Sequence, residues 1–357
     1  RVHGLFGAAG HLRFGGGRGR LQTQPYVGAF EPVVDEEVPG EQPVRLQLRD
    51  YPDVHIVTYD KLTYSGNLDN LRDADPARHT FVRGDIADPD TLGPALEGCD
   101  AVVNFAAESH VDRSLNGAAD FIATNVAGVN TVLDQARRAG VGRVLLVSTD
   151  EVYGSIDEGA FRETDAPHPR NPYAASKAAG ELFGTAHRET YGLHVVTTRG
   201  SNTYGPYQYP EKVLPLFVTN ALDGQPLPLY GDGMNVRDWL YVDDHCRGID
   251  TALRKGAPGE VYNIPGGNER HNIALTRRIL ELTGRDETLI RPVADRVGHD
   301  RRYAIDGAKL RALGWAPRMD WDEGIALTVQ WYRDNEWWWR KIKSGEFREY
   351  YRRQYGL

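Results

Sequence analysis

Through the middle of this 357-residue chain, short apolar runs alternate with longer helical patterns, and few architectures accommodate that alternation. The runs are almost continuously apolar, which is typical of parallel strands covered by helices on both faces. The pattern therefore predicts an α/β fold with a doubly wound parallel sheet of the Rossmann type. We expect strands at 55–59, 80–83, 101–105, 143–148 and 194–198, and helices at 118–139 and 173–191.

After Gly200 the pattern loosens, because turn-rich segments interrupt the short apolar runs. This change predicts a smaller, loop-rich lobe laid over the ends of the strands. The expected domains are a large one formed by 1–199, to which 237–265 return, and a lobe formed by 200–236 and 266–357.

Composition excludes several classes of protein. The chain has 42 Lys and Arg against 50 Asp and Glu, a formal charge of −8, which gives no overall attraction to nucleic acid or to an anionic membrane. There is no stretch of about 18 apolar residues that would predict a spanning helix. Cys99 and Cys246 cannot form a disulfide framework, and no Cys or His cluster predicts a metal site. Since no apolar signal segment opens the sequence, we expect a cytoplasmic protein.

The tail from Trp331 to Leu357 is aromatic and basic, with three consecutive tryptophans at 337–339 before Arg340 and Lys341. Aromatic side chains beside cations are typical of single-stranded nucleic-acid binding. Because the whole chain is acidic, we favour a C-terminal helix that packs its tryptophans on the body of the protein.

Rossmann domains bind the pyrophosphate of a dinucleotide on a glycine-rich turn after the first strand. Gly7 and Gly10 are the candidates for that cofactor contact, since they match the first two glycines of a GxxGxxG turn. Arg13 stands at the third position, and residues 14–43 predict neither helix nor strand. The turn is therefore incomplete as a phosphate-binding motif.

Asp60 closes the strand expected at 55–59. A carboxylate at this end of a strand can accept hydrogen bonds from both ribose hydroxyls, and an Asp there favours NAD over NADP. A turn or helix-cap role for Asp60 is the alternative.

Tyr173 and Lys177 are four residues apart, so they share one face of the expected helix. A free phenol has a pKa of about 10, and a neighbouring ammonium lowers it, so that Tyr173 can act as a base near neutral pH. The spacing alone is also compatible with a Tyr and a Lys that merely pair on the surface of the helix. The strand that ends at Ser148 and Thr149 can place a hydroxyl beside the tyrosine, and the set resembles the Ser/Thr–Tyr–Lys triad of the extended short-chain dehydrogenase/reductases.

Asp150 and Glu151 follow Thr149 directly. Adjacent residues of a strand point to opposite faces, so both carboxylates can face one substrate only if the strand has ended there. Two carboxylates in different environments can divide acid and base work between them. A solvated loop is the alternative interpretation of the pair.

At this point a specific resemblance emerges. Several motifs, in order and with compatible spacing from about residue 44 to the C-terminus, closely resemble those of the dTDP-glucose 4,6-dehydratases. The motifs are Asp60–Tyr64, Ala106–Ser114, Ser148–Gly154, Tyr204–Gln208 and Gly298–Tyr303. The Asp150-Glu151 pair is the discriminating feature, because related epimerases lack it.

The resemblance implies a redox-neutral elimination on a nucleotide sugar, dTDP-glucose, with tightly retained NAD and no metal. Tyr173 would take the proton of the C4 hydroxyl, and Lys177 would bind the cofactor ribose and lower the tyrosine pKa. Glu151 would remove the C5 proton, Asp150 would protonate the departing C6 hydroxyl, and Thr149 would hold the C4 oxygen.

The resemblance also implies binding residues. Besides the glycine candidates, the cofactor cleft would contain Asp60, Lys61, Leu62, Thr63, Asp85, Ile86, Phe105, Ala106, Ala107, Ser109, Thr124, Tyr173 and Lys177. The nucleotide-sugar site would contain Ser109, Thr149, Asn202, Lys212, Val213, Pro228, Tyr230, Arg237, Asn272 and His299. Lys and Arg side chains are suited to a diphosphate, and Arg can bind it through a bidentate fork.

Two other functions stay open. The first is another NAD-dependent nucleotide-sugar enzyme, an epimerase or a decarboxylase, against which the Asp150-Glu151 pair argues. The second is a non-catalytic member that binds a nucleotide or a protein partner, which the incomplete glycine turn favours. The resemblance further implies a homodimer formed through helices of the dinucleotide-binding domain.

Overall fold

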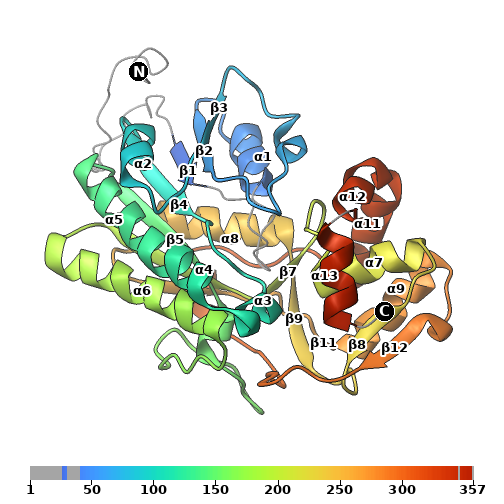
Figure 1. Cartoon of the computed structure of the whole chain (residues 1–357). Helices are drawn as coiled ribbons and strands as arrows, with labels where there is room; N and C mark the ends of the chain where they lie inside the picture. Colours follow the sequence, from blue (N-terminus) through green and yellow to red (C-terminus); the bar gives the residue numbers. More distant parts are fainter. Residues whose placement is uncertain (1–25, 30–40, 345, 356–357) are drawn as a thin grey trace.

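The computed structural model describes residues 26–29, 41–344 and 346–355 (Figure 1). The glycine candidates Gly7 and Gly10 lie outside the described residues.

The large sheet has seven parallel strands in the order β10-β6-β5-β4-β1-β2-β3. This is the strand order of a Rossmann fold with one further strand at the edge. The strands are β1 (Tyr26–Ala29), β2 (Ile56–Asp60), β3 (His79–Arg83), β4 (Ala101–Asn104), β5 (Arg143–Thr149), β6 (Val195–Gly200) and β10 (Val261–Ile264). The predicted doubly wound α/β sheet is confirmed.

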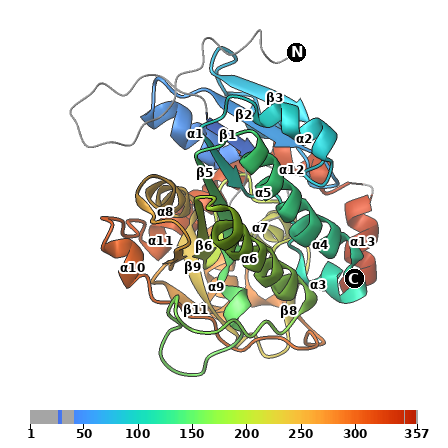
Figure 2. The same cartoon turned by 90° about the vertical axis from the view of Figure 1, so that its left-hand side faces the viewer.

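Helices cover both faces of this sheet, as Figure 2 shows. Alternate residues of a strand point to opposite faces. On β5, Leu145 and Val147 belong to the apolar core that includes helices α1 (Glu41–Asp50) and α8 (Val242–Lys255). Val144 and Leu146 belong to the core on the other face. The helices there are α2 (Pro89–Leu96), α4 (Ala119–Ile122), α5 (Val129–Arg138) and α6 (Pro172–Tyr191), with the π-helical segment η3 (Ala123–Gly128) between α4 and α5.

Strand β1 corrects a sequence-based expectation. The sequence predicts neither helix nor strand for 14–43, yet β1 occupies the middle of the sheet, where Val27 pairs with Val57 on one side and Val102 on the other. Helix α1 then begins at Glu41. The strand has only four residues and includes Gly28, so its local pattern is weak, and pairing with two neighbours determines its conformation.

The second half of the chain adds two small sheets. One has the order β11-β9-β7 and the other pairs β12 with β8. These strands are β7 (Asn202–Tyr204), β8 (Leu227–Tyr230), β9 (Val236–Tyr241), β11 (Glu269–His271) and β12 (Ile290–Val293). Within 237–265, α8 and β10 return to the large sheet, whereas β9 pairs in a small one. We therefore propose the same two lobes with one change: strand β9 (236–241) belongs to the smaller lobe, and the return to the large domain begins with α8.

Helices complete this smaller lobe (Figure 1). They are α7 (Val213–Leu222), α9 (Asn272–Thr283), α10 (Ala308–Arg311), α11 (Trp321–Asp334), α12 (Glu336–Ile342) and α13 (Glu346–Tyr355). The short helix α3 (Val111–Asn116) lies where the two lobes meet. None of the helices in the described ranges is long and apolar enough to cross a membrane.

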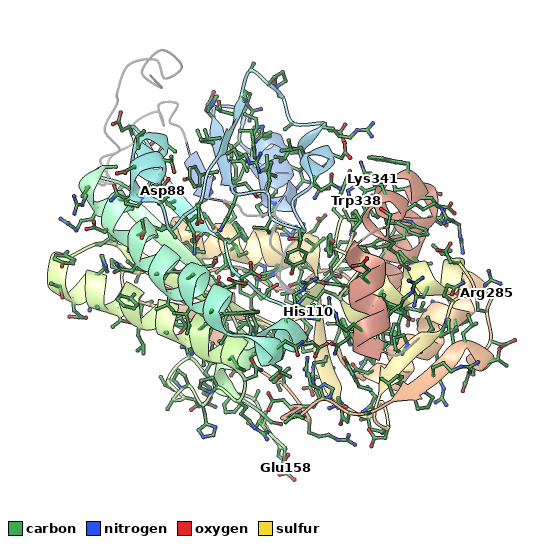
Figure 3. All side chains as sticks on the ribbon, viewed as in Figure 1. Asp88, His110, Glu158, Arg285, Trp338 and Lys341 are labelled. Carbon is green, nitrogen blue, oxygen red and sulfur yellow. The ribbon has the colours of Figure 1, made fainter. Side chains whose placement is uncertain are left out.

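The tryptophan-rich tail packs on the body of the protein. This is the interpretation that the acidic net charge favoured over nucleic-acid binding. Trp338 and Trp339 are almost completely buried. The Trp338 indole donates to Asn70 Oδ1 at 2.6 Å, and the Trp339 indole donates to the Tyr332 carbonyl at 2.7 Å. Only Trp337 of the three has a substantially exposed side chain, and it contacts cations of the protein itself, Arg72 and Lys341. Figure 3 shows Trp338 against the body of the molecule.

Candidate active site

The two adjacent carboxylates lie in a turn immediately after a central strand. Strand β5 ends at Thr149, and a short 3₁₀ helix, η4 (Asp150–Tyr153), begins at the next residue. The Thr149 hydroxyl accepts a hydrogen bond from the Glu151 backbone N–H at 3.3 Å, which caps the new helix. Because the strand has ended, the alternation of side chains no longer applies, and Asp150 and Glu151 are both buried.

The predicted Tyr-Lys pair lies beside the same strand end. Tyr173 is in the first turn of α6 and is completely buried, and Lys177 is buried one turn later. The Lys177 ammonium donates to the Val147 carbonyl of β5 at 2.7 Å. This bond fixes the lysine next to the strand that ends at Thr149. The structure therefore brings together all five predicted catalytic residues.

The start of α6 is joined to the carboxylate turn by a residue absent from the sequence-based site. Asn171 caps α6, since its Oδ1 accepts from the Ala174 backbone N–H at 2.8 Å. Its Nδ2 donates to Glu151 Oε2 at 2.9 Å. An Asn followed by Pro at a helix start is a recognisable capping signal, so the cap was visible in the sequence, but its contact with Glu151 depends on the fold.

A pocket extends from Glu151 into the smaller lobe. Most of the predicted nucleotide-sugar residues line it together with Glu151: Asn202, Lys212, Val213, Pro228, Tyr230, Arg237, Asn272 and His299. Ser109 and Thr149 are outside this lining. Ser109 is completely buried, and its carbonyl accepts from the Lys212 ammonium at 3.1 Å, so it lies directly behind the pocket. Figure 3 shows the lining residue His110 near the centre of the molecule.

Cationic side chains line this pocket. Lys212 and Arg237 are buried, and the Arg237 guanidinium lies 4.2 Å from the centre of the Tyr303 ring and donates to the Asp300 carbonyl. Arg296 adds a third cation. Burial, reinforced by Arg296 and Arg237, lowers the pKa of His299 to about 4, so this imidazole is neutral near pH 7. Arg296 is paired with Asp112 at 3.4 Å, so Lys212 and Arg237 are the cations best suited to an anionic group of a ligand.

Three further lining residues were absent from the sequence-based site. Asp112 accepts from the Tyr230 hydroxyl at 3.0 Å, and Glu211 is held by the Tyr64 hydroxyl and by Arg113. Asp112 belongs to the Ala106–Ser114 motif, and Glu211 directly precedes the predicted residue Lys212. Tyr355 of α13 lies near Tyr230 in space, with ring centres 6.0 Å apart, although 124 residues separate the two tyrosines in the chain, so no local signal could have found it.

The cofactor candidates after β2 form a tight turn. Asp60 is buried at the end of the strand, and its Oδ1 accepts from the Leu62 backbone N–H at 2.5 Å. Leu62 has a positive φ of 55°, which is uncommon for a residue other than glycine. Lys61 and Asp85 form an ion pair at 2.7 Å that links the segments after β2 and β3. Asp60 therefore stabilises a turn, which was the alternative interpretation to ribose binding. The same turn places Thr63 just beyond the end of the strand.

A second group of cofactor candidates follows β4. Phe105, Ala106 and Ala107 are buried directly after the strand, and Thr124 is buried in the π-helical segment η3. Next to Thr124, Asn125 accepts from the Glu108 N–H at 2.7 Å and donates to the Glu108 carbonyl at 2.8 Å. Such π-helical turns occur frequently at functional sites. Ile86 is completely buried in the apolar core.

These residues fit a dinucleotide across the carboxyl edge of the sheet. In a doubly wound fold the ligand binds where the strand order reverses, which here lies between β1 and β4. Asp60 stands on one side of that point, and Tyr173 and Lys177 stand on the other. Within the described part of the chain, Asn104 Oδ1 at the end of β4 and the Ser109 hydroxyl are buried without a hydrogen-bond partner, as expected of groups that meet a polar ligand.

The pyrophosphate contact is a separate matter. Gly7 and Gly10 precede β1 in the sequence, whereas a Rossmann glycine turn joins the first strand to the first helix, here β1 to α1. The role of the two glycines stays a prediction.

Comparison with known proteins gives a consistent result. Residues 40–328 match the family model described as GDP-mannose 4,6 dehydratase. A dTDP-glucose 4,6-dehydratase from Streptomyces antibioticus is 54% identical over 290 residues, which are 81% of this chain and 86% of that protein.

Solved structures agree with this result. The dTDP-glucose 4,6-dehydratase DesIV from Streptomyces venezuelae, with NAD and the ligand TYD bound, has 52% sequence identity and a TM-score of 0.85, covering 90% of this chain and 100% of that chain. A UDP-glucose 4-epimerase from Thermus thermophilus, in complex with NAD, has 29% identity and a TM-score of 0.78, covering 87% and 99%. The chain therefore belongs to the nucleotide-sugar dehydratase family of that model, and within it to the dTDP-glucose 4,6-dehydratases.

Proposed function

We propose that this protein is a dTDP-glucose 4,6-dehydratase, which converts dTDP-glucose to dTDP-4-keto-6-deoxyglucose with bound NAD. The proposal depends above all on the buried Asp150-Glu151 pair at the end of β5, beside Tyr173 and Lys177. The relatives described above support both the substrate and the cofactor. Bound NAD would supply the hydride acceptor for C4 of the sugar and the hydride donor for C6.

Tyr173 acts on the C4 hydroxyl. Its phenolate oxygen accepts the hydroxyl proton as C4 becomes a carbonyl carbon, and the Lys177 ammonium favours the phenolate form that this step requires. The bond from Lys177 to the Val147 carbonyl keeps the ammonium near the strand end. Thr149, whose hydroxyl caps η4, holds the C4 oxygen.

The two carboxylates divide the elimination. Once C4 is a carbonyl, the C5 proton is acidic, and Glu151 removes it as a carboxylate. Asp150 protonates the departing C6 hydroxyl, which leaves as water, and the proton taken up by Glu151 returns to C5 when C6 is reduced. Two buried carboxyl groups in one turn do not ionise equally, because each negative charge disfavours the other, and this supports one acid and one base.

The smaller lobe holds the nucleotide. Lys212 and Arg237, with Arg296 beside them, supply positive charge for the diphosphate. Tyr230, Asn272 and neutral His299 supply hydrogen bonds and an aromatic face for the nucleoside. Because these groups project from the lobe while Glu151 projects from the large sheet, substrate binding spans both parts of the fold.

The mass of the product tests the function. With NAD supplied, dTDP-glucose loses one water if the protein is a dehydratase, whereas an epimerase leaves the mass unchanged. A protein that binds dTDP-glucose but leaves the mass unchanged at every concentration contradicts the proposal.

We further propose a homodimer, formed through the outer faces of α4 and α6. These helices contact each other, and Figure 2 shows them side by side with α5 on the face turned to the viewer. Large apolar side chains are exposed there: Leu182 is 69% exposed, Ile122 57% and Phe183 38%. A second copy of the chain that covered this face would remove them from water.

A further inference from the structure

The side chain of Asn171 connects the two elements that the proposed reaction uses. It is 8% exposed and lies at the start of α6, two residues before Tyr173. Its amide oxygen accepts from the Ala174 N–H at 2.8 Å, and its amide nitrogen donates to Glu151 Oε2 at 2.9 Å. Both ends of one small group are therefore occupied, one by the helix and the other by the candidate base.

The type of residue at this position has a chemical consequence. Ser, Thr and Asp also cap helices well, because each supplies an acceptor for the first free N–H groups. None of them supplies an acceptor to a helix and an N–H donor to a carboxylate through one rigid planar group, as Asn does. Helix capping alone does not require an amide at position 171. What Asn171 adds beyond the other capping residues is the nitrogen that donates to Glu151.

We propose that Asn171 is a positioning residue of the elimination step, which holds Glu151 ionised and correctly oriented relative to Tyr173. A hydrogen bond donated to one oxygen of a carboxylate favours the charged form over the neutral acid. It also restricts the rotamer of the Glu151 side chain. Because the same amide is fixed to α6, the base and the tyrosine keep a constant separation through both chemical steps. This inference rests on the proposed dehydratase function.

Two substitutions separate this role from helix capping. Asn171→Ser keeps a capping oxygen and removes the amide nitrogen that donates to Glu151 Oε2. Asn171→Asp keeps the shape and the capping oxygens but faces Glu151 with a second carboxylate, which disfavours its ionisation. The other titratable groups around Glu151 are unchanged in both: Asp150 in the same turn, Tyr173 and Lys177 on α6, Tyr303, and Lys212, Arg237 and His299 in the pocket.

The readouts are the absorbance of the reduced cofactor in single turnover, the rate of water loss, and the pH profile of that rate. For Asn171→Ser we expect water loss to slow about tenfold with little change in the oxidation of C4, so that reduced cofactor accumulates. For Asn171→Asp we expect a larger loss, with the acid limb of the profile moved to higher pH. Asp320→Ser, a cap change on distant α11, is the control and should alter none of these.

The inference is overturned if both variants slow oxidation and water loss equally with an unshifted pH profile, because that is the result of a weakened helix alone. Should Asn171→Ser fail to fold, Asn171→Asp still decides, since its capping oxygens are intact. If the unsubstituted protein removes no water from dTDP-glucose, the proposed function itself is wrong. That result is distinguishable from a failure of this inference alone, in which the unsubstituted protein is active.

Discussion

At the end of β5, three consecutive polar side chains have different surroundings. Thr149 caps η4 and contacts Asp150 Oδ1 at 3.4 Å, whereas Glu151 accepts from Asn171 and lines the pocket. A donor on Glu151 favours its ionised form, while the neighbouring negative charge favours a protonated Asp150. On this argument we assign Glu151 as the base and Asp150 as the acid, and the assignment stays a proposal.

Replacing the acid tests that assignment. In Asp150→Asn the side chain keeps its shape but cannot donate an acidic proton, so we expect water loss to slow by about 100-fold or more, as is typical for loss of a general acid. Oxidation of C4 should change much less. Single-turnover absorbance of the reduced cofactor and product mass measure the two steps. Abolished oxidation with normal elimination would show that the role given to Asp150 is wrong.

Glu108 offers a pH-dependent test of the segment after β4. Burial, with a smaller contribution from Asp120, raises the pKa of Glu108 from its ordinary 4.5 to about 7. The folded protein therefore binds this proton more tightly than the unfolded chain, so the free energy of unfolding falls as pH rises from about 4.5 to about 7. In Glu108→Gln that decrease should be smaller.

Thermal unfolding across this pH range measures the effect. The control is Glu158→Gln, whose side chain is exposed at the outer edge of the molecule (Figure 3). Identical pH dependence in Glu108→Gln and in the unsubstituted protein would contradict the raised pKa.

Among single residues, the sequence identified candidates whose motifs are local, and their catalytic roles stay predictions. Thr149, Asp150, Glu151, Tyr173 and Lys177 come from two short motifs, and the fold brings those motifs together. It missed Asn171 and Tyr355, because their importance depends on contacts with residues 20 and 125 positions away. Spacing within a motif contains no information about such contacts.

At the scale of elements, helices α4 and α6 have an apolar outer face that the fold itself does not cover. We expect Leu182→Glu to convert a dimer to a monomer, because it places a charge among Ile122 and Phe183 at the centre of the proposed interface. Light scattering after gel filtration gives the mass. The control is Leu327→Glu, at a 47% exposed leucine of α11 outside this face.

The outcomes of this experiment are distinct. A monomeric unsubstituted protein, or a dimer that survives Leu182→Glu, would contradict the proposed interface. Dissociation by both substitutions would show that the effect is not confined to α4 and α6.

The strands also show where sequence-based prediction of elements ends. The near-continuous apolar runs of β2, β4, β5 and β6 predicted these strands to within a residue or two, because burial on both faces demands apolar side chains throughout. Strand β1 was missed, although it lies at the centre of the sheet. Its four residues are ordered by pairing with β2 and β4, which are distant in the chain.

For the whole molecule, the order of the large sheet determines where the ligands meet. The strand order reverses between β4 and β1, and the proposed cofactor groups stand on either side of that point at the carboxyl edge. The pocket then extends from Glu151 into the smaller lobe. One substrate can thus reach the catalytic turn and the cationic residues together, as an internal redox cycle requires.

The central claim is that the chain completes this cycle with the NAD it retains. Mass spectrometry of dTDP-glucose incubated with purified protein, without added NAD, tests it most directly. We expect the loss of one water and no net reduction or oxidation of the sugar nucleotide. Water loss only after NAD is added would contradict tight retention of the cofactor and leave the dehydratase function standing. An unchanged substrate even with saturating NAD would contradict the account.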